Sequence, residues 1–207
     1  MEGYIKDFTQ LTNINRNMTS NNDDEFIIES GIAKGIDALV KYKGEKIYVW
    51  AVYSIGMITR TDEENTYSPH FDRRHNINFV TSYKFGNNNS WKADIRWNLG
   101  SGFPFTQTQA FYENITFSDG INTDYTTTNG ELAVQYAELN EGRLPYYHRL
   151  DLSISKKINL NKNITMDVTA SITNAYNRRN IFYFNRIKYE RVDQLPIMPS
   201  IGASIIF

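Results

Sequence analysis

The sequence predicts an all-β protein, with an antiparallel up-and-down sheet of the kind that forms a transmembrane β-barrel. Three observations support this fold class. Apolar and polar residues alternate with a period of two along much of the chain, which is typical of strands with one apolar face and one polar face. Short and long connections follow one another in turn. Aromatic residues make up 14% of the chain, and many lie near the ends of the alternating segments.

The clearest element is a hairpin over residues 146–173. In its first strand Leu150, Leu152 and Ile154 alternate with polar residues, and residues 164–172 alternate more strictly. A helix would place these apolar residues all round its axis. The break between the two runs is rich in Asn, which tolerates left-handed backbone angles and suits a turn. We therefore expect an antiparallel hairpin with one apolar face.

The other elements follow from the same alternation. We expect residues 1–30 to form a loop with a possible strand end at residues 4–8, the tail of an eighth strand. Residues 31–207 are expected to form one β-sheet segment of about seven strands. The expected strands are 31–43, 47–60, 73–85, 91–99, 146–158, 164–173 and 196–207.

The connections alternate in length. In an up-and-down sheet this alternation places every short turn at one end and every long loop at the other. Bacterial outer-membrane barrels have this arrangement, with short periplasmic turns and long extracellular loops. The short connections are 43–46, 86–89 and 159–163, and the long ones are 61–72, 100–145 and 174–195.

Aromatic residues fall into two groups, as membrane interfaces require. The face opposite the apolar one carries charged and hydroxyl side chains, which suits a wide lumen filled with water or a polar plug. The group near the short turns is Tyr42, Tyr48, Tyr83, Phe85 and Trp91; the group near the long loops is Tyr67, Phe103, Tyr146, Tyr147 and Tyr176.

Composition excludes several function classes. The net charge is −1, so no nucleic-acid partner is expected. The chain has no cysteine and only three histidines, and it contains no catalytic or nucleotide-binding motif. We therefore expect no enzymatic activity, no cofactor and no metal site. No run of apolar residues is long enough for a transmembrane helix.

Five segments together resemble a known family. They are FDRRH at residues 71–75, LGSGFPFT at 99–106, PYYHRLDLSISKK at 145–157, ITNAYNRRNIFYF at 172–184, and QLPIMPSIG at 194–202 with the terminal Phe207. The pattern resembles the C-terminal end of a TonB-dependent outer-membrane receptor, in the branch with an N-terminal carboxypeptidase-regulatory-like domain. The resemblance covers most of residues 31–207, and its last third is the most specific part.

The resemblance implies the outer membrane of a Gram-negative bacterium and about seven to eight strands of a 22-stranded barrel. Receptors of this family import a scarce ligand, such as a siderophore complex, cobalamin or a glycan. The implied partners are outer-membrane lipid, the barrel assembly machinery, and the plug domain and remaining strands, which this chain lacks. TonB would act only through the missing N-terminal part. The chain shows no signal peptide or TonB box, so we expect a fragment, a miscalled start or an engineered piece that does not transport alone.

Ligand contacts are expected in the long loops, because binding residues often lie on loops held by a rigid scaffold. Aromatic rings there could stack on a sugar or a chelate, or could pack the loops together. The resemblance also assigns a role to the terminal Phe207, as the signal for the barrel assembly machinery. The candidate ligand contacts are Phe103, Phe105, Phe111, Tyr112 and Tyr125.

Two alternatives remain open. One is a self-contained small outer-membrane barrel that acts as an adhesin or a structural protein, which requires an even number of strands. The other is a soluble β-barrel carrier with a small ligand inside, which requires an apolar interior and a polar exterior.

Overall fold

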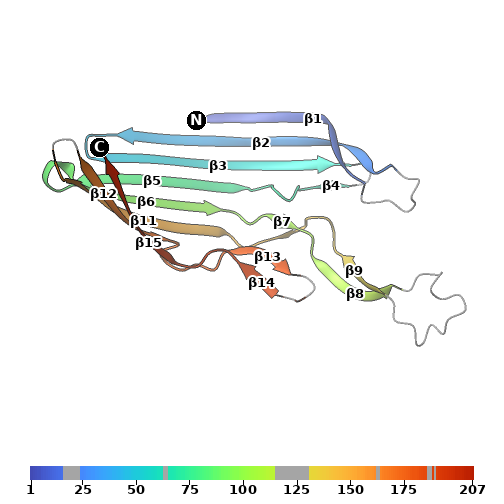
Figure 1. The fold of residues 1–207 in the computed structure, drawn as a ribbon. Helices are drawn as coiled ribbons and strands as arrows, with labels where there is room; N and C mark the ends of the chain where they lie inside the picture. Colours follow the sequence, from blue (N-terminus) through green and yellow to red (C-terminus); the bar gives the residue numbers. More distant parts are fainter. Residues whose placement is uncertain (16–23, 63–64, 115–130, 162–163, 186–187, 189) are drawn as a thin grey trace, which may run out of the picture.

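The structure is a computed structural model that describes residues 1–15, 24–62, 65–114, 131–161, 164–185, 188 and 190–207. The described residues form antiparallel β-sheets and a single 3-10 turn, η1 (Asn87–Asn89), which confirms the all-β prediction. The main sheet has the order β1-β2-β3-β5-β6-β11-β12-β15, with β4 paired to β3 (Figure 1). Its strands are β1 (Glu2–Ile14), β2 (Phe26–Lys43), β3 (Ile47–Thr61), β4 (Thr66–Tyr67), β5 (His75–Phe85), β6 (Trp91–Gly100), β11 (Tyr147–Asn159), β12 (Thr165–Thr173) and β15 (Met198–Ile206).

The sheet is open at both sides. Each long strand pairs with its neighbour along the up-and-down path, and all these pairs are antiparallel. Within the described residues β1 pairs only with β2, and β15 pairs only with β12. The two outer strands therefore each keep one edge without a partner, and the sheet does not close on itself.

Connections of different length lie at opposite ends of the sheet (Figure 1). The turn between β2 and β3 and the 3-10 turn η1 lie at one end. At the turn that contains η1, Gly86 has a φ of 79° and Asn88 a φ of 54°. Gly and Asn tolerate these left-handed angles. The connections at the other end carry small sheets of their own, since a long loop without secondary structure is uncommon. These sheets pair β7 (Pro104–Phe105) with β10 (Gly142–Arg143), β8 (Thr108–Asn114) with β9 (Glu131–Tyr136), and β13 (Ile181–Asn185) with β14 (Glu190–Asp193).

Strand β1 is longer than the strand end expected at residues 4–8, and β2 begins at Phe26, before the expected start at residue 31. A register shift between Phe8 and Leu11 interrupts the alternation within β1. Gly3 and Ile5 lie on one face before the shift, whereas even-numbered residues take that face after it. The period of two is therefore broken in the sequence although the strand continues.

The hairpin predicted over residues 146–173 is formed by β11 and β12. Ile154 lies opposite Ala170, and Leu152 opposite Ile172. These pairs keep the apolar residues of both strands on one side, as the alternation predicts.

Cross-strand register extends this sorting over the whole sheet. The apolar face is the side defined by the pairs Ile36–Ile55, Ile55–His75, Ile77–Leu99, Ile95–Leu152, Ile154–Ala170 and Ala170–Ile201. The polar face is the opposite side, defined by Ser82, Asp94, Asn98, Ser153, Asp167 and Thr169.

The apolar face has no layer packed over it in the described structure. Its side chains are exposed to an extent unusual for large hydrophobic residues, with 80% for Ile5, 68% for Ile28 and 85% for Ile201. The only hydrophobic residues that count as buried in the described part are Ala33 and Tyr67. A water-soluble domain of this length normally buries a core between two layers, and this sheet does not.

No helix in the described part of the chain is both long enough and apolar enough to cross a membrane.

Candidate functional site

Aromatic rings form a continuous row on the apolar face at the short-turn end. The rings of Tyr83 and Phe85 stack with their centroids 5.9 Å apart, and those of Phe85 and Trp91 stack at 6.1 Å. The ammonium group of Lys156 lies 4.9 Å from the centroid of the Trp91 ring. Rings with an apolar body and a polar neighbour are typical of the boundary between lipid and water.

A second row lies at the long-loop end of the same face. The Tyr53 hydroxyl is 2.9 Å from Nδ1 of His75, and the Tyr176 hydroxyl is 2.6 Å from Nδ1 of His148. Trp97 lies on the same face, near the long-loop end of β6. The polar atoms of the Tyr and His rings therefore form hydrogen bonds with one another at the strand ends. The face between the two rows is apolar.

The register assigns some of the predicted aromatic residues to other places. Tyr48 lies on the polar face opposite Ser82, and Tyr147 has the same orientation on β11. Tyr67 is buried against Glu29, and Phe103 stacks on a guanidinium group. The alternation over residues 47–60 predicts the face of Tyr48 correctly, whereas the contacts of Tyr67 and Phe103 join distant parts of the chain and have no local signal.

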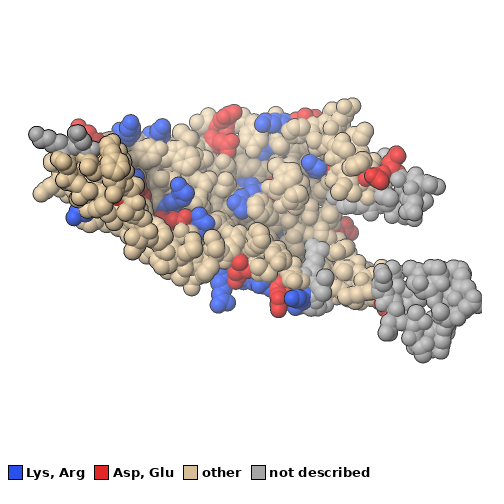
Figure 2. All heavy atoms as spheres, viewed as in Figure 1, with Lys and Arg blue, Asp and Glu red and all other residues tan. Residues whose placement is uncertain are grey.

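The polar face is a network of short side chains and paired charges. The hydroxyl groups of Ser82 and Ser153 both donate to the Asp94 carboxylate, and Lys92 forms an ion pair with it at 2.7 Å. On the side of the molecule that Figure 2 shows, acidic and basic side chains lie in small groups rather than in a patch of one sign. The network around Asp94 is therefore hydrophilic, and its carboxylate is paired.

A buried carboxylate joins two long connections and strand β3 at the long-loop end. The side chain of Asp72 is 1% exposed and accepts hydrogen bonds from Nε of Arg74 at 2.8 Å and from Arg143 at 2.5 Å. The backbone N–H of Ile58 donates to the same carboxylate at 2.9 Å. Burial raises the pKa of Asp72, but the hydrogen bonds from Arg143, Arg74 and Ile58 outweigh it, so the pKa lies below its usual value.

A second buried carboxylate fixes β4 to the sheet. Glu29 is 1% exposed, and the Tyr67 hydroxyl donates to its two oxygens at 2.8 and 2.9 Å. The Asn13 amide donates at 2.9 Å, and Arg60 lies 3.4 Å away. The two carboxylates, Glu29 and Asp72, hold the start of the long connections against the strand ends.

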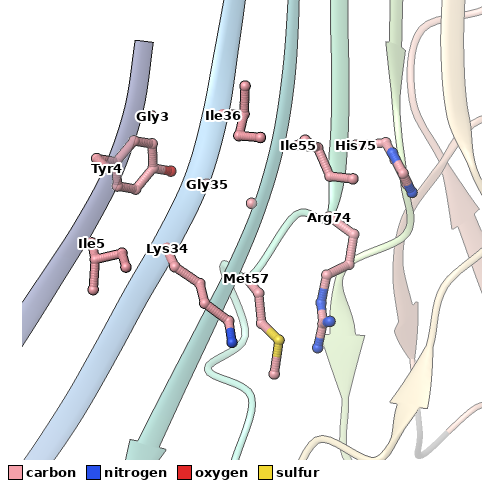
Figure 3. A pocket seen from close by; sticks show the side chains of 11 residues that line it. Gly3, Tyr4, Ile5, Lys34, Gly35, Ile36, Ile55, Met57, Arg74 and His75 are labelled. Carbon is pink, nitrogen blue, oxygen red and sulfur yellow. The ribbon is translucent and has the colours of Figure 1, made fainter.

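Glycine residues lie side by side on the adjacent strands β1, β2 and β3, where they leave the backbone without side chains (Figure 3). A shallow hollow in this region is lined by Gly3, Gly35 and Gly56 together with apolar and basic side chains. A side chain on Gly35 would start 2.7 Å from the Tyr4 hydroxyl, so Tyr4 occupies the space beside these backbones. The aromatic ring thereby covers the glycines of the neighbouring strands.

Two of the predicted ligand contacts come together in one aromatic hollow. Phe105 and Phe111 line it with Phe182, Tyr183 and Phe184, and the rings of Phe105 and Phe184 are 6.0 Å apart. Phe182, Tyr183 and Phe184 were not among the predicted contacts, although their unbroken aromatic run in the sequence was a usable signal.

The other predicted residues lie elsewhere. Phe103 faces Arg73 rather than the aromatic hollow. Tyr112 is 51% exposed on β8 and does not line the hollow, and Phe207 is 90% exposed at the end of the chain. Tyr125 lies outside the described residues. In the described ranges no group of three or more acidic, histidine or cysteine side chains could hold a metal ion.

Comparison with known proteins found no match. No protein-family model, no curated protein and no solved structure matches this chain.

Proposed function

We propose that this chain is the C-terminal part of the barrel wall of a TonB-dependent outer-membrane transporter for a scarce ligand. The observation that carries the proposal is the exposed apolar face, bounded by two rows of aromatic residues and backed by a hydrophilic face. A membrane barrel needs this orientation, with apolar residues toward lipid and polar residues toward the lumen. A soluble carrier with a ligand inside needs the reverse.

The open edges support a part of a larger barrel. The outer edges of β1 and β15 carry unpaired backbone groups in the described structure. Each such group costs several kcal/mol in lipid, so strands outside this chain would pair with both edges. In the complete barrel the polar face lines the lumen, and the long connections surround the entrance on the outer side.

Tryptophan fluorescence tests the membrane-facing side directly. Trp91 and Trp97 belong to the apolar face, whereas Trp50 lies opposite Val80 on the polar face. Three variants that each keep one tryptophan, with phenylalanine at the other two positions, are folded into vesicles with brominated acyl chains. We expect bromine to quench most of the emission of Trp91 and Trp97 and little of that of Trp50, which is the matched control. Equal quenching at all three positions would contradict the assignment of the faces.

The eight long strands of the main sheet in the described structure favour a second candidate, a self-contained small outer-membrane barrel, because such barrels can have eight strands. The reading frame upstream of Met1 in the native gene separates the two candidates. The transporter requires an in-frame plug domain and further strands upstream. A stop codon directly before Met1, with a promoter of its own, would favour the small barrel and end the transporter proposal.

A further inference from the structure

The side chain of Arg73, just before β5, is held in place by its neighbours. Its guanidinium group lies on the backbone of Gly100, where any Cβ atom would collide with it. The centroid of the Phe103 ring is 4.2 Å from Cζ of Arg73, and that of the Tyr147 ring is 5.8 Å away. A planar cation held by aromatic faces is oriented before any ligand arrives.

This arginine lacks the carboxylate partner that nearby arginines have. Arg74 and Arg143 pair with Asp72, and Arg149 pairs with Asp151 at 2.9 Å. Within the described part of the chain, Arg73 has no ion pair, and its buried Nε has no hydrogen-bond partner. Burial lowers the pKa of Arg73, yet a guanidinium group stays charged in proteins, so its positive charge is uncompensated.

The polar face beside Arg73 is hollowed. Asn76, Asn98, Tyr147 and Arg149 line this lumen hollow together with Gln194 from the connection before β15. Its volume is about 380 Å³, which suits a small molecule rather than a protein domain. Amide groups both donate and accept hydrogen bonds, so they match hydroxyl groups, while the guanidinium fork matches a carboxylate.

We propose that the lumen hollow binds a small hydroxylated carboxylate of the sugar-acid type. The carboxylate pairs with Arg73, and the amides of Asn76, Asn98 and Gln194 bind the hydroxyl groups. The inference rests on the proposed function, since it takes the polar face as the lumen side of a transporter wall. It adds a class of solute and a place on the wall where that solute is held.

Calorimetric titration of the full 207-residue chain, folded in detergent micelles, tests this inference with D-glucuronate and D-glucose as probes. We expect saturable binding of glucuronate and binding of glucose at least about tenfold weaker, because a charged hydrogen bond contributes that much or more. Arg73→Gln should weaken glucuronate binding at least about tenfold, and Arg73→Lys, which keeps the charge but loses the fork, should give an intermediate affinity.

Arg96→Gln is the matched control, because Arg96 is exposed on the polar face of β6 and does not line the lumen hollow. Its affinity for glucuronate should remain that of the unchanged chain. The inference is overturned if the unchanged chain does not bind glucuronate, if it binds glucose equally well, or if Arg73→Lys and Arg73→Gln both bind normally. Circular dichroism checks that each variant is folded.

The tryptophan quenching described above separates the two proposals. If Trp91 and Trp97 contact lipid and glucuronate does not bind, only the solute site fails. If the tryptophans do not contact lipid, the transporter wall fails, whatever the titration shows.

Discussion

Replacing Ile95 with arginine is expected to destabilise the membrane-inserted chain by about 2–4 kcal/mol, the cost of a basic side chain at the middle of the lipid-facing side of a barrel. Ile95 lies near the middle of β6 on the apolar face, between the rows that contain Trp91 and Trp97. Its side chain faces neither the polar network nor either aromatic row, so a charge at this position has no partner. Urea unfolding in lipid vesicles measures the loss as a shift of the midpoint.

Thr169→Arg is the control for this substitution. Thr169 lies on the polar face of β12, opposite Ser155 and one position from Ala170 on the other face. The same side chain introduced there should leave the unfolding free energy within about 0.5 kcal/mol, as surface substitutions usually do. If Thr169→Arg proved the more harmful change, the polar face would be the buried one and a soluble carrier would be the better interpretation.

The sequence could predict the regular half of this fold. Residues 91–99 and 164–173 alternate without interruption, and both became strands within about two residues of the expected bounds. In such strands the period of two encodes both the element and its face. The turn sequences predicted where the chain reverses direction, because Gly and Asn tolerate the left-handed backbone angles found at residues 86 and 88.

The rest of the fold depends on contacts that no local pattern encodes. The register shift between Phe8 and Leu11 hides β1, because the positions on the apolar face are odd-numbered before the shift and even-numbered after it. Arg143 meets Asp72 although 71 residues separate them along the chain. The lumen hollow likewise combines Arg73 with Gln194. Aromatic residues in the loops were therefore recognised as candidates, but which of them would meet was not predictable.

Replacing Asp72 with alanine is expected to cost about 2–3 kcal/mol of folding free energy. Removing one partner of a fully buried ion pair costs about 3–5 kcal/mol, but Arg74 and Arg143 are each about one third exposed, so water screens part of the loss. The N–H of Ile58 also loses its acceptor. Asp193→Ala is a matched control, because the Arg191–Asp193 pair has the same 2.5 Å separation as Arg143–Asp72 but is far more exposed. It should cost at most about 1 kcal/mol.

The effect of Asp72 should also depend on pH. Its pKa is lowered in the folded chain, so the folded state favours the ionised carboxylate more than the unfolded state does. The stabilisation is then fully present above the unfolded pKa of about 3.9 and is lost as the pH falls through the lower folded value. Urea midpoints of the unchanged chain and of Asp72→Asn should therefore differ at pH 7 and converge at the acid end. A difference that stays constant down to pH 2 would mean that the carboxylate acts through packing rather than through its charge.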